Sequence, residues 1–379
     1  MDYRAIRKEL HEHPQTAGNE QFAHDLIVSQ LQQLHPDKVY THVGGWGVIA
    51  VWGKNPQAPT IAFRADTDAL PIGHRCGHDG HTTILLRLAE EVDKLISLSV
   101  DKASDNISTN ILLLWQPAEE TGEGARAVLG SGILQQYDIR AFYALHNLPG
   151  YPLGTVVLCP HTFAAASTGV IYHLDGRETH ASTPELGINP GLAVAEIINR
   201  FNGFNGAGAP AEHYDGEFRQ STLICVRVGQ PAFGTSAGHA EVMFTLRAFT
   251  NLAMDSLLAE ANAAVDEVAQ RYGLTVSRML QEPFRATENN EDCVNMLMRQ
   301  CVCDDATNTN ANTQSRINAI IKETPFRWSE DFAEYLQYFK GAMFGIGSGE
   351  RHPELHHPSY EFPDELIELA AQFFLRLLR

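Results

Sequence analysis

The sequence predicts an α/β protein in which a smaller α+β domain interrupts a domain built on a mixed β-sheet. Two observations support this fold class. At both ends of the chain, apolar runs typical of buried strands alternate with amphipathic stretches, as in helices packed on a largely parallel sheet. Between residues 168 and 281 the order becomes β-α-β-β-α-β, which is the order of a ferredoxin-like module.

The chain length supports the same division into two domains. Its 379 residues exceed the roughly 250–300 at which one hydrophobic core stops growing. We therefore expect a first domain from residues 1–167 and 282–379 and an inserted domain from residues 168–281.

Local patterns predict the elements of each domain. In the first domain we expect helices at residues 2–34, broken near Pro14 and Gly18, and at 82–98 and 124–134, with strands at 43–53, 60–66, 110–117 and 141–147. In the inserted domain we expect strands at 167–176, 221–229, 240–249 and 274–283 and helices at 190–201 and 255–273. Helical and buried-strand segments at 293–300, 331–339 and 341–348 and a helix from Asp364 then continue the first domain.

The composition argues against several kinds of partner. The formal charge is −18, from 28 basic and 46 acidic residues. Such a surface repels phosphate backbones and anionic lipids, so we expect neither a nucleic-acid nor a membrane partner. No apolar run approaches the roughly 18 residues of a membrane-spanning helix, and the charged N-terminal segment lacks a signal-peptide core. The six cysteines form no CxxC pair, which indicates a reducing compartment and a cytoplasmic protein.

The strongest chemical signal is the segment Cys76-Gly-His78-Asp-Gly-His81. Residues i and i+2 of an extended segment project to the same side, so Cys76 and His78 can reach one metal ion. A hydrogen-bonded loop around a buried cysteine is the structural alternative.

Three expected strands end in polar residues that could join this segment. Asp66 and Asp68 follow the first strand, Glu119 and Glu120 follow the second, and His146 ends the third. Ligands of open α/β sheets gather at the carboxyl ends of strands, and paired carboxylates can divide metal binding and proton transfer between them. Taken alone, the glutamates could begin a helix, and the histidine could be a hydrogen-bonded core residue.

These segments occur in the order of a known family. The chain resembles the metal-dependent amidohydrolases that include hippurate hydrolase, the auxin-conjugate (IAA-amino acid) hydrolases and N-acetyl-diaminopimelate deacetylase, within the zinc aminopeptidase and carboxypeptidase superfamily. The segments that carry the resemblance are RADTDALPI, CGHDGHT, QPAEETGEGARAVLGSGIL, LHNLPGYPLGT, SEDFAEYL and LHHPSYEFPDE. The resemblance covers nearly the whole chain and implies a zinc-peptidase-like catalytic domain with an inserted lid or dimerisation domain.

The resemblance implies a site for two divalent metal ions. Its ligands would be Cys76, His78, Glu120, His146 and His356. His356 is preferred to His357 because the family places its histidine two residues before a proline, here Pro358, although a swap stays open. The ions could be Zn²⁺, Mn²⁺, Ni²⁺ or Co²⁺, since thiolate favours zinc while imidazole and carboxylate suit all four.

The resemblance also assigns roles to five other residues. Glu119 would be the general base that takes a proton from the attacking water and passes it to the leaving amine. Asp68 would orient a ligand from behind, and His81 would support the metal site. In the inserted domain, His180 would stabilise the tetrahedral oxyanion, in relatives across a dimer, and Arg247 would bind a substrate carboxylate. An exposed histidine without a catalytic role is the alternative for His180.

Three departures from the family pattern bear on the substrate. Only residues 73–75 separate DALPI from CGHDGH, which makes this loop shorter than in relatives. Residues Gly234 to Ala237 stand where relatives have Asn-Val-Ile-Pro, and Glu185 stands where relatives often have a second histidine.

We therefore expect a two-metal amidohydrolase that cleaves the amide bond of an N-acyl amino acid or a similar small conjugate, as a possible homodimer through the inserted domain. One alternative is an aminopeptidase or dipeptidase of the same family. The other is a catalytically impaired metal-binding protein.

Overall fold

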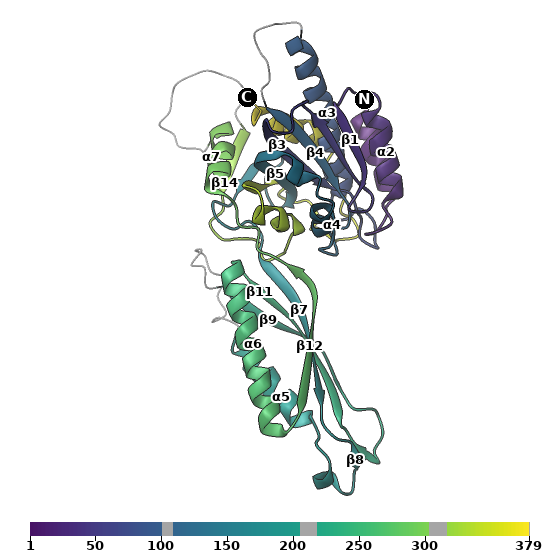
Figure 1. The fold of residues 1–379 in the computed structure, drawn as a ribbon, viewed down its shortest axis with the longest axis vertical. Helices are drawn as coiled ribbons and strands as arrows, with labels where there is room; N and C mark the ends of the chain where they lie inside the picture. Colours follow the sequence, from purple (N-terminus) through teal and green to yellow (C-terminus); the bar gives the residue numbers. More distant parts are fainter. Residues whose placement is uncertain (101–108, 205–217, 303–316, 379) are drawn as a thin grey trace. The chain divides into compact units, whose positions relative to one another are not determined.

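The computed structural model describes residues 1–100, 109–204, 218–302 and 317–378 (Figure 1). They form two compact units. Unit 1 contains residues 1–163, 287–323 and 330–379, and unit 2 contains residues 164–286 and 324–329. The predicted fold class, a mixed-sheet α/β domain with an inserted α+β domain, is confirmed.

Unit 1 is built on one mixed sheet, in the order β1-β2-β4-β3-β5-β15-β6-β14-β13 within the described residues. The strands are β1 (Lys38–Val43), β2 (Gly47–Trp52), β3 (Pro59–Asp66), β4 (Asn110–Gln116), β5 (Asp138–Pro149), β6 (Val156–Leu158), β13 (Cys301–Val302), β14 (Ile317–Ile321) and β15 (Gly341–Gly349). The central strands β4, β3, β5 and β15 run parallel. The carboxyl ends of β3, β4 and β5 therefore meet at one edge of the sheet.

Helices cover both faces of this sheet. On one face lie α1 (Tyr3–Glu12), α2 (Gln21–Leu31), α3 (His78–Val100), α7 (Glu291–Gln300) and α8 (Glu365–Arg376), around a core that includes Phe63, Trp115 and Phe374. On the other face lie α4 (Gly124–Gly130) and the 3₁₀ helices η1 (Leu134–Gln136) and η3 (Asp331–Gln337). Phe142 of β5 contacts Phe332 of η3 there, whereas its neighbour Tyr143 faces the first core, as alternation along a strand requires.

Unit 2 has the predicted β-α-β-β-α-β order. Its strands β7 (Ala166–Asp175), β9 (Arg219–Val228), β11 (His239–Ala248) and β12 (Thr275–Phe284) form an antiparallel sheet in the order β12-β7-β11-β9. Helices α5 (Gly191–Asn202) and α6 (Asn251–Tyr272) pack on one face of it (Figure 1). Beyond the sheet, β8 (Thr179–His180) pairs with β10 (Thr235–Ser236), next to the 3₁₀ helix η2 (Pro184–Leu186).

The structure differs from two local predictions and assigns one further segment to unit 2. The segment expected as one strand at 43–53 is β2 together with the turn that joins it to β1, because the chain turns at Gly44, whose φ is +62° and where a Cβ would lie 2.5 Å from the backbone nitrogen of Val128. Within the segment 331–339, residues Asp331–Gln337 form the 3₁₀ helix η3. Residues 324–329 belong to unit 2, since the Ala165 N–H donates to the carbonyls of Phe326 and Trp328.

No described helix combines the length and the apolar character needed to cross a membrane. The boundaries expected at residues 167 and 281, the catalytic and lid roles of the two domains, and the cytoplasmic location stay predictions.

The core contact between α8 and the sheet predicts a large effect of truncating Phe374. Its ring is 1% exposed and lies 4.9 Å from that of Phe63, centroid to centroid. We expect Phe374→Ala to lower the free energy of unfolding by about 3–5 kcal/mol, because the cavity cannot collapse in a packed core.

The matched control is Leu369→Ala on the same helix, where the side chain is 41% exposed. We expect it to change the free energy by about 0.5 kcal/mol or less. Urea denaturation followed by circular dichroism measures both variants, and equal losses would contradict the placement of α8.

Candidate metal centre

The predicted ligands converge at the carboxyl edge of the parallel strands. β3 ends at Asp66, opposite Gln116 of β4, and Glu119 and Glu120 follow β4 directly. His146 lies near the end of β5, which is parallel to β3. The remaining ligands come from the start of α3 and from the segment before α8. The edge of the sheet thus brings together residues far apart in the sequence.

Cys76 is common to two groups of ligand atoms. Cys76, His78 and His146 form one group, and Cys76, Glu120 and His356 form the other, with all ligand atoms of a group within 4.8 Å of one another. The Cys76 sulfur lies 3.7 Å from Nε2 of His146 and 3.4 Å from Nε2 of His356. Each group offers three ligands of the types that zinc and similar ions prefer.

The two buried histidines present the nitrogen that a metal needs. Nδ1 of His78 donates to the Asp68 carbonyl at 2.9 Å, and Nδ1 of His146 donates to the Asn147 carbonyl at 2.9 Å. A carbonyl can only accept, so the lone pair of each ring is on Nε2, on the side of the cluster.

Unpaired polar atoms at the centre fit a bound cation. Nε2 of His78 and Oε1 of Glu120 are buried and have no hydrogen-bond partner among the residues that the structure describes. Buried polar atoms without a partner are costly in a folded protein. The donor set of thiol, imidazole and carboxylate therefore fits divalent metal ions.

The structure brings His356 to the cluster and directs His357 elsewhere. His356 has a left-handed backbone with φ +65°, and its N–H donates to the Arg75 carbonyl at 2.8 Å. Nδ1 of His357 instead accepts the Ser359 N–H at 3.2 Å and bonds to the Ser359 hydroxyl at 2.6 Å.

A strained turn aims the two glutamates. Ala118 has a φ of +55°, a conformation that non-glycine residues rarely adopt. Its N–H donates to Oε1 of the fully buried Glu20 at 2.8 Å, and the N–H of Glu120 donates to Oδ2 of Asp68 at 3.0 Å. Both bonds hold the turn in the shape that points Glu119 inward, where it is 6% exposed.

The surroundings of Glu119 favour its protonated form. Burial is the largest cause that raises the pKa of this carboxyl, followed by the negative charges of Glu330 and Glu120. A carboxylate with a raised pKa is, in its ionised form, a stronger base toward water.

Asp68 and His81 occupy supporting positions. The carbonyl of Asp68 accepts from His78, and its carboxylate accepts from the Glu120 backbone. Both ring nitrogens of His81 are used, Nδ1 by Asp66 at 2.6 Å and Nε2 by Asn147. Asp66, His78 and His81 also lie close enough to form a ligand group, but His81 has no nitrogen left to bind a metal.

A buried ion cluster that was not predicted from the sequence lies behind this site. Arg64 contacts Asp66 at 2.7 Å and both Glu330 and Asp331 at 2.8 Å. Its guanidinium satisfies acids that, with Glu119, would otherwise resemble another metal group. An arginine inside the apolar strand TIAFRAD is a signal that could have found it, because a buried cation needs acidic partners.

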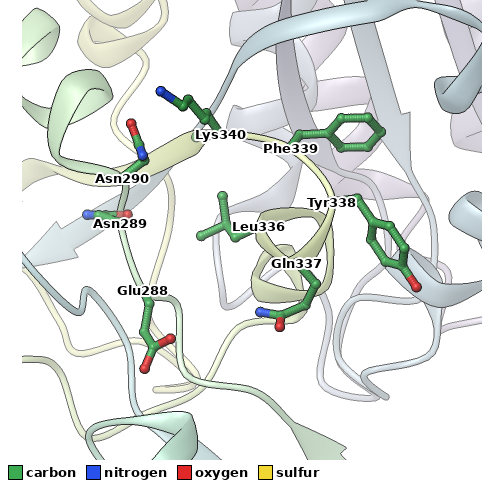
Figure 2. A pocket seen from close by; sticks show the side chains of 9 residues that line it. Glu288, Asn289, Asn290, Leu336, Gln337, Tyr338, Phe339 and Lys340 are labelled. Carbon is green, nitrogen blue, oxygen red and sulfur yellow. The ribbon is translucent and has the colours of Figure 1, made fainter.

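Figure 2 shows a separate hollow of unit 1, of about 380 Å³, between residues 288–290 and 336–341. The Asn289 side chain in this hollow is hydrogen-bonded: its amide donates to the carbonyls of Cys159 at 3.0 Å and Met343 at 2.9 Å and accepts from the Met343 N–H at 2.8 Å. No predicted ligand lines it, so the candidate centre lies elsewhere.

In unit 2, His180 and Arg247 lie in different surroundings. His180 is exposed in β8, and its Nδ1 lies 2.7 Å from the Ser182 hydroxyl. Arg247 is partly buried, which lowers its pKa, and its Nη1 donates to the Arg327 carbonyl at 2.7 Å and the Ser329 hydroxyl at 3.1 Å. The substrate roles of both residues stay predictions.

Comparisons with known proteins identify the family and the fold. The model of peptidase family M20/M25/M40 matches residues 62–379. Hippurate hydrolase of Campylobacter jejuni is 25% identical over 99% of this chain and 95% of its own, and N-acetylcysteine deacetylase of Bacillus subtilis is 25% identical over 98% and 94%. A dinuclear metal-binding peptidase of the M20 family from Bacillus subtilis shares the fold, with a TM-score of 0.79 and 22% identity over 99% and 96% of the two chains.

The mixed sheet and the ligand cluster at its carboxyl edge are those expected of a metal-dependent hydrolase. The chain belongs to peptidase family M20/M25/M40, since the family model matches most of its length. It is a metal-dependent hydrolase of carbon–nitrogen bonds with a small-molecule substrate, and the predicted family resemblance is confirmed.

His74, in the short loop before Cys76, gives a prediction about acid stability. The ring is 3% exposed, its Nδ1 lacks a partner among the described residues, and burial lowers its pKa from 6.5 to about 4. His74 therefore binds a proton more readily in the unfolded chain than in the folded protein. As the pH falls from about 6.5 to about 4, this difference lowers the free energy of unfolding.

As the pH falls from about 6.5 to about 4, we expect the free energy of unfolding of the metal-free His74→Phe variant to decrease by about 3 kcal/mol less than that of the metal-free wild type. Urea denaturation at a series of pH values in a chelator measures the difference. His161→Phe is the control, because His161 is exposed, and parallel curves for wild type and His74→Phe would contradict the burial of the neutral ring.

Proposed function

We propose that the protein is a two-metal amidohydrolase that cleaves N-acyl amino acids or similar small conjugates. The observation that carries the proposal is the sharing of Cys76 by two ligand groups, one with His78 and His146 and one with Glu120 and His356. These residues would hold two divalent ions, which would supply Lewis acidity for amide hydrolysis.

The catalytic steps follow from the positions of the side chains. When bound, two divalent ions supply the Lewis acidity that polarises an amide carbonyl and lowers the pKa of water. Glu119, buried beside Glu120, takes the proton from the attacking water and passes it to the leaving amine. Asp68 holds His78 and the Glu120 backbone in place by hydrogen bonds. His81 supports the site through its hydrogen bond to Asp66.

The donor set leaves four metals open. The Cys76 thiolate favours Zn²⁺, while the histidines and Glu120 also suit Mn²⁺, Ni²⁺ and Co²⁺.

The substrate class is supported by the relatives and by unit 2. Two relatives are named for hippurate and for N-acetylcysteine. We assign Arg247 to the substrate carboxylate, because its Nη1 is anchored in unit 2 by the Arg327 carbonyl. The exposed Glu185 would instead suit the amine of a peptide, so dipeptides are the comparison substrates.

Unit 2 also supports a homodimer in which His180 stabilises the oxyanion. The helices α5 and α6 cover one face of its sheet. Apolar side chains on its outer strands β9 and β12 are exposed, namely Leu223, Ile224, Val226, Val228, Met279 and Leu280. Light scattering on the purified protein tests the dimer, and a monomer at micromolar concentration would contradict it.

Removing single ligands should separate the two metals. We expect Cys76→Ala to retain less than one equivalent of metal, whereas His146→Ala and His356→Ala each retain about one, because only the cysteine belongs to both groups. Inductively coupled plasma mass spectrometry after dialysis measures this. One full equivalent in Cys76→Ala would contradict the shared ligand.

Removing the base should abolish turnover and leave the metals bound. We expect Glu119→Gln to lower kcat by about 10²–10⁴-fold, measured on a panel of N-acyl amino acids and dipeptides. Wild-type turnover by this variant would contradict the role of Glu119 as the base.

The same substrate panel distinguishes the alternative functions. A wild-type enzyme that is active only on dipeptides would favour the aminopeptidase or dipeptidase alternative. A wild-type protein that is inactive on the whole panel with both metals bound would favour a catalytically impaired metal-binding protein.

A further inference from the structure

Arg7 is a buried cation at the start of α1 that has no place in the proposed chemistry. It is 4% exposed. Its guanidinium contacts three carboxylates: Nη1 lies 3.1 Å from Asp79, Nη2 lies 3.1 Å from Glu361, and Nε donates to Asp364. One arginine therefore joins two parts of the chain that are more than 280 residues apart.

The first of these parts is residues 75–81, a loop and the first turn of α3, called the ligand loop below. Asp79 lies next to His78, is fully buried, and also accepts from Nδ1 of His11 at 2.8 Å. Arg7 and His11 are four residues apart in α1 and so project from the same face of the helix. Through Asp79, this face holds the loop that carries Cys76 and His78.

The second part is the C-terminal segment, residues 356–364, which begins with the proposed ligand His356. Arg75 donates to the Tyr360 carbonyl at 2.5 Å, and Phe362 packs so closely on Gly80 that a Cβ there would lie 2.2 Å from its ring. The segment is thus packed against the ligand loop. Arg7 adds the charge contacts that fix its far end, through Glu361 and Asp364.

The two ligand groups depend on these contacts to different degrees. His146 belongs to β5, so the group of Cys76, His78 and His146 is held by the loop and the sheet. The group of Cys76, Glu120 and His356 also needs the C-terminal segment to stay against the loop. Loss of Arg7 would leave Glu361 and Asp364 to repel each other and Asp79.

We propose that Arg7 is a positioning residue that holds the C-terminal segment against the ligand loop and so sets the affinity of the metal bound through His356. This inference rests on the proposed two-metal site. A purely structural brace would weaken folding or both metals alike, whereas this role weakens one metal selectively.

The test is a stepwise titration of the full-length, metal-stripped protein with Co²⁺, followed by calorimetry and by the thiolate-to-cobalt absorption of Cys76. We expect Arg7→Met to bind one equivalent as the wild type does, with its thiolate absorption intact. The other equivalent should bind about 10–100-fold more weakly, the usual effect of losing a residue that orients a ligand.

Arg87→Met is the matched control. Arg87 also pairs with several acids, Glu90, Glu91 and Glu368 of α8, and its side chain is 12% exposed. None of its ion pairs within the described residues reaches the ligand loop or the C-terminal segment. We expect it to bind both equivalents with wild-type affinity.

A second variant keeps the test decisive if Arg7→Met does not fold. The double variant Glu361→Gln/Asp364→Asn leaves Arg7 and Asp79 in place and removes only the contacts to the C-terminal segment. It should show the same selective weakening. If this variant and Arg7→Met both bind the two equivalents with wild-type affinity, the proposed role of Arg7 is wrong, but the two-metal site is not affected. Fewer than two equivalents in the wild type would overturn the two-metal site as well.

Discussion

The structure depends on a set of buried ligand atoms that converge at the carboxyl edge of the sheet, two of them without a hydrogen-bond partner among the described residues. Nε2 of His78 and Oε1 of Glu120 have no hydrogen-bond partner among the described residues, and the thiol of Cys76, which shares a ligand group with each of these residues, is 7% exposed. Burial also raises the pKa of Cys76 to about 12, so without a nearby cation the sulfur would stay protonated. A metal ion resolves both problems, because it binds the lone pairs and stabilises the thiolate.

The surrounding fold is arranged to keep these atoms from finding other partners. Backbone carbonyls of Asp68 and Asn147 take the Nδ1 protons of the two buried histidines, and Glu20 and Asp68 pin the turn that carries the glutamates. Arg64 neutralises the acids behind that turn. Each contact removes a competing hydrogen bond or charge and leaves the ligands facing inward.

The fold class and most of the site could be predicted from the sequence, because both depend on local patterns. Apolar runs specify buried strands, and the polar residues that end them must meet where parallel strands end. CGHDGH, QPAEE and LHN therefore identified the residues that the structure brings together, and the order of strands and helices at 168–281 identified the inserted module.

Contacts between distant segments could not be predicted in the same way. In the sequence, Arg7 is one of several charged residues on an amphipathic helix, and no neighbouring residue indicates that Asp79 and Glu361 are its partners. The positive φ of Ala118 could not be predicted, because the residue is not a glycine. The conformational strain of this backbone is offset by contacts made elsewhere in the chain. The choice between His356 and His357 likewise depends on a backbone bond to Arg75 that only the folded structure contains.

The central claim is that Cys76 serves two metal ions at once. The most direct measurement is a crystal structure of the metal-loaded protein, with anomalous data collected at the absorption edge of the metal found in the sample. The account predicts two anomalous peaks, both within bonding distance of the Cys76 sulfur, one beside His146 and the other beside His356. A single peak, or two peaks of which only one contacts the sulfur, would contradict it.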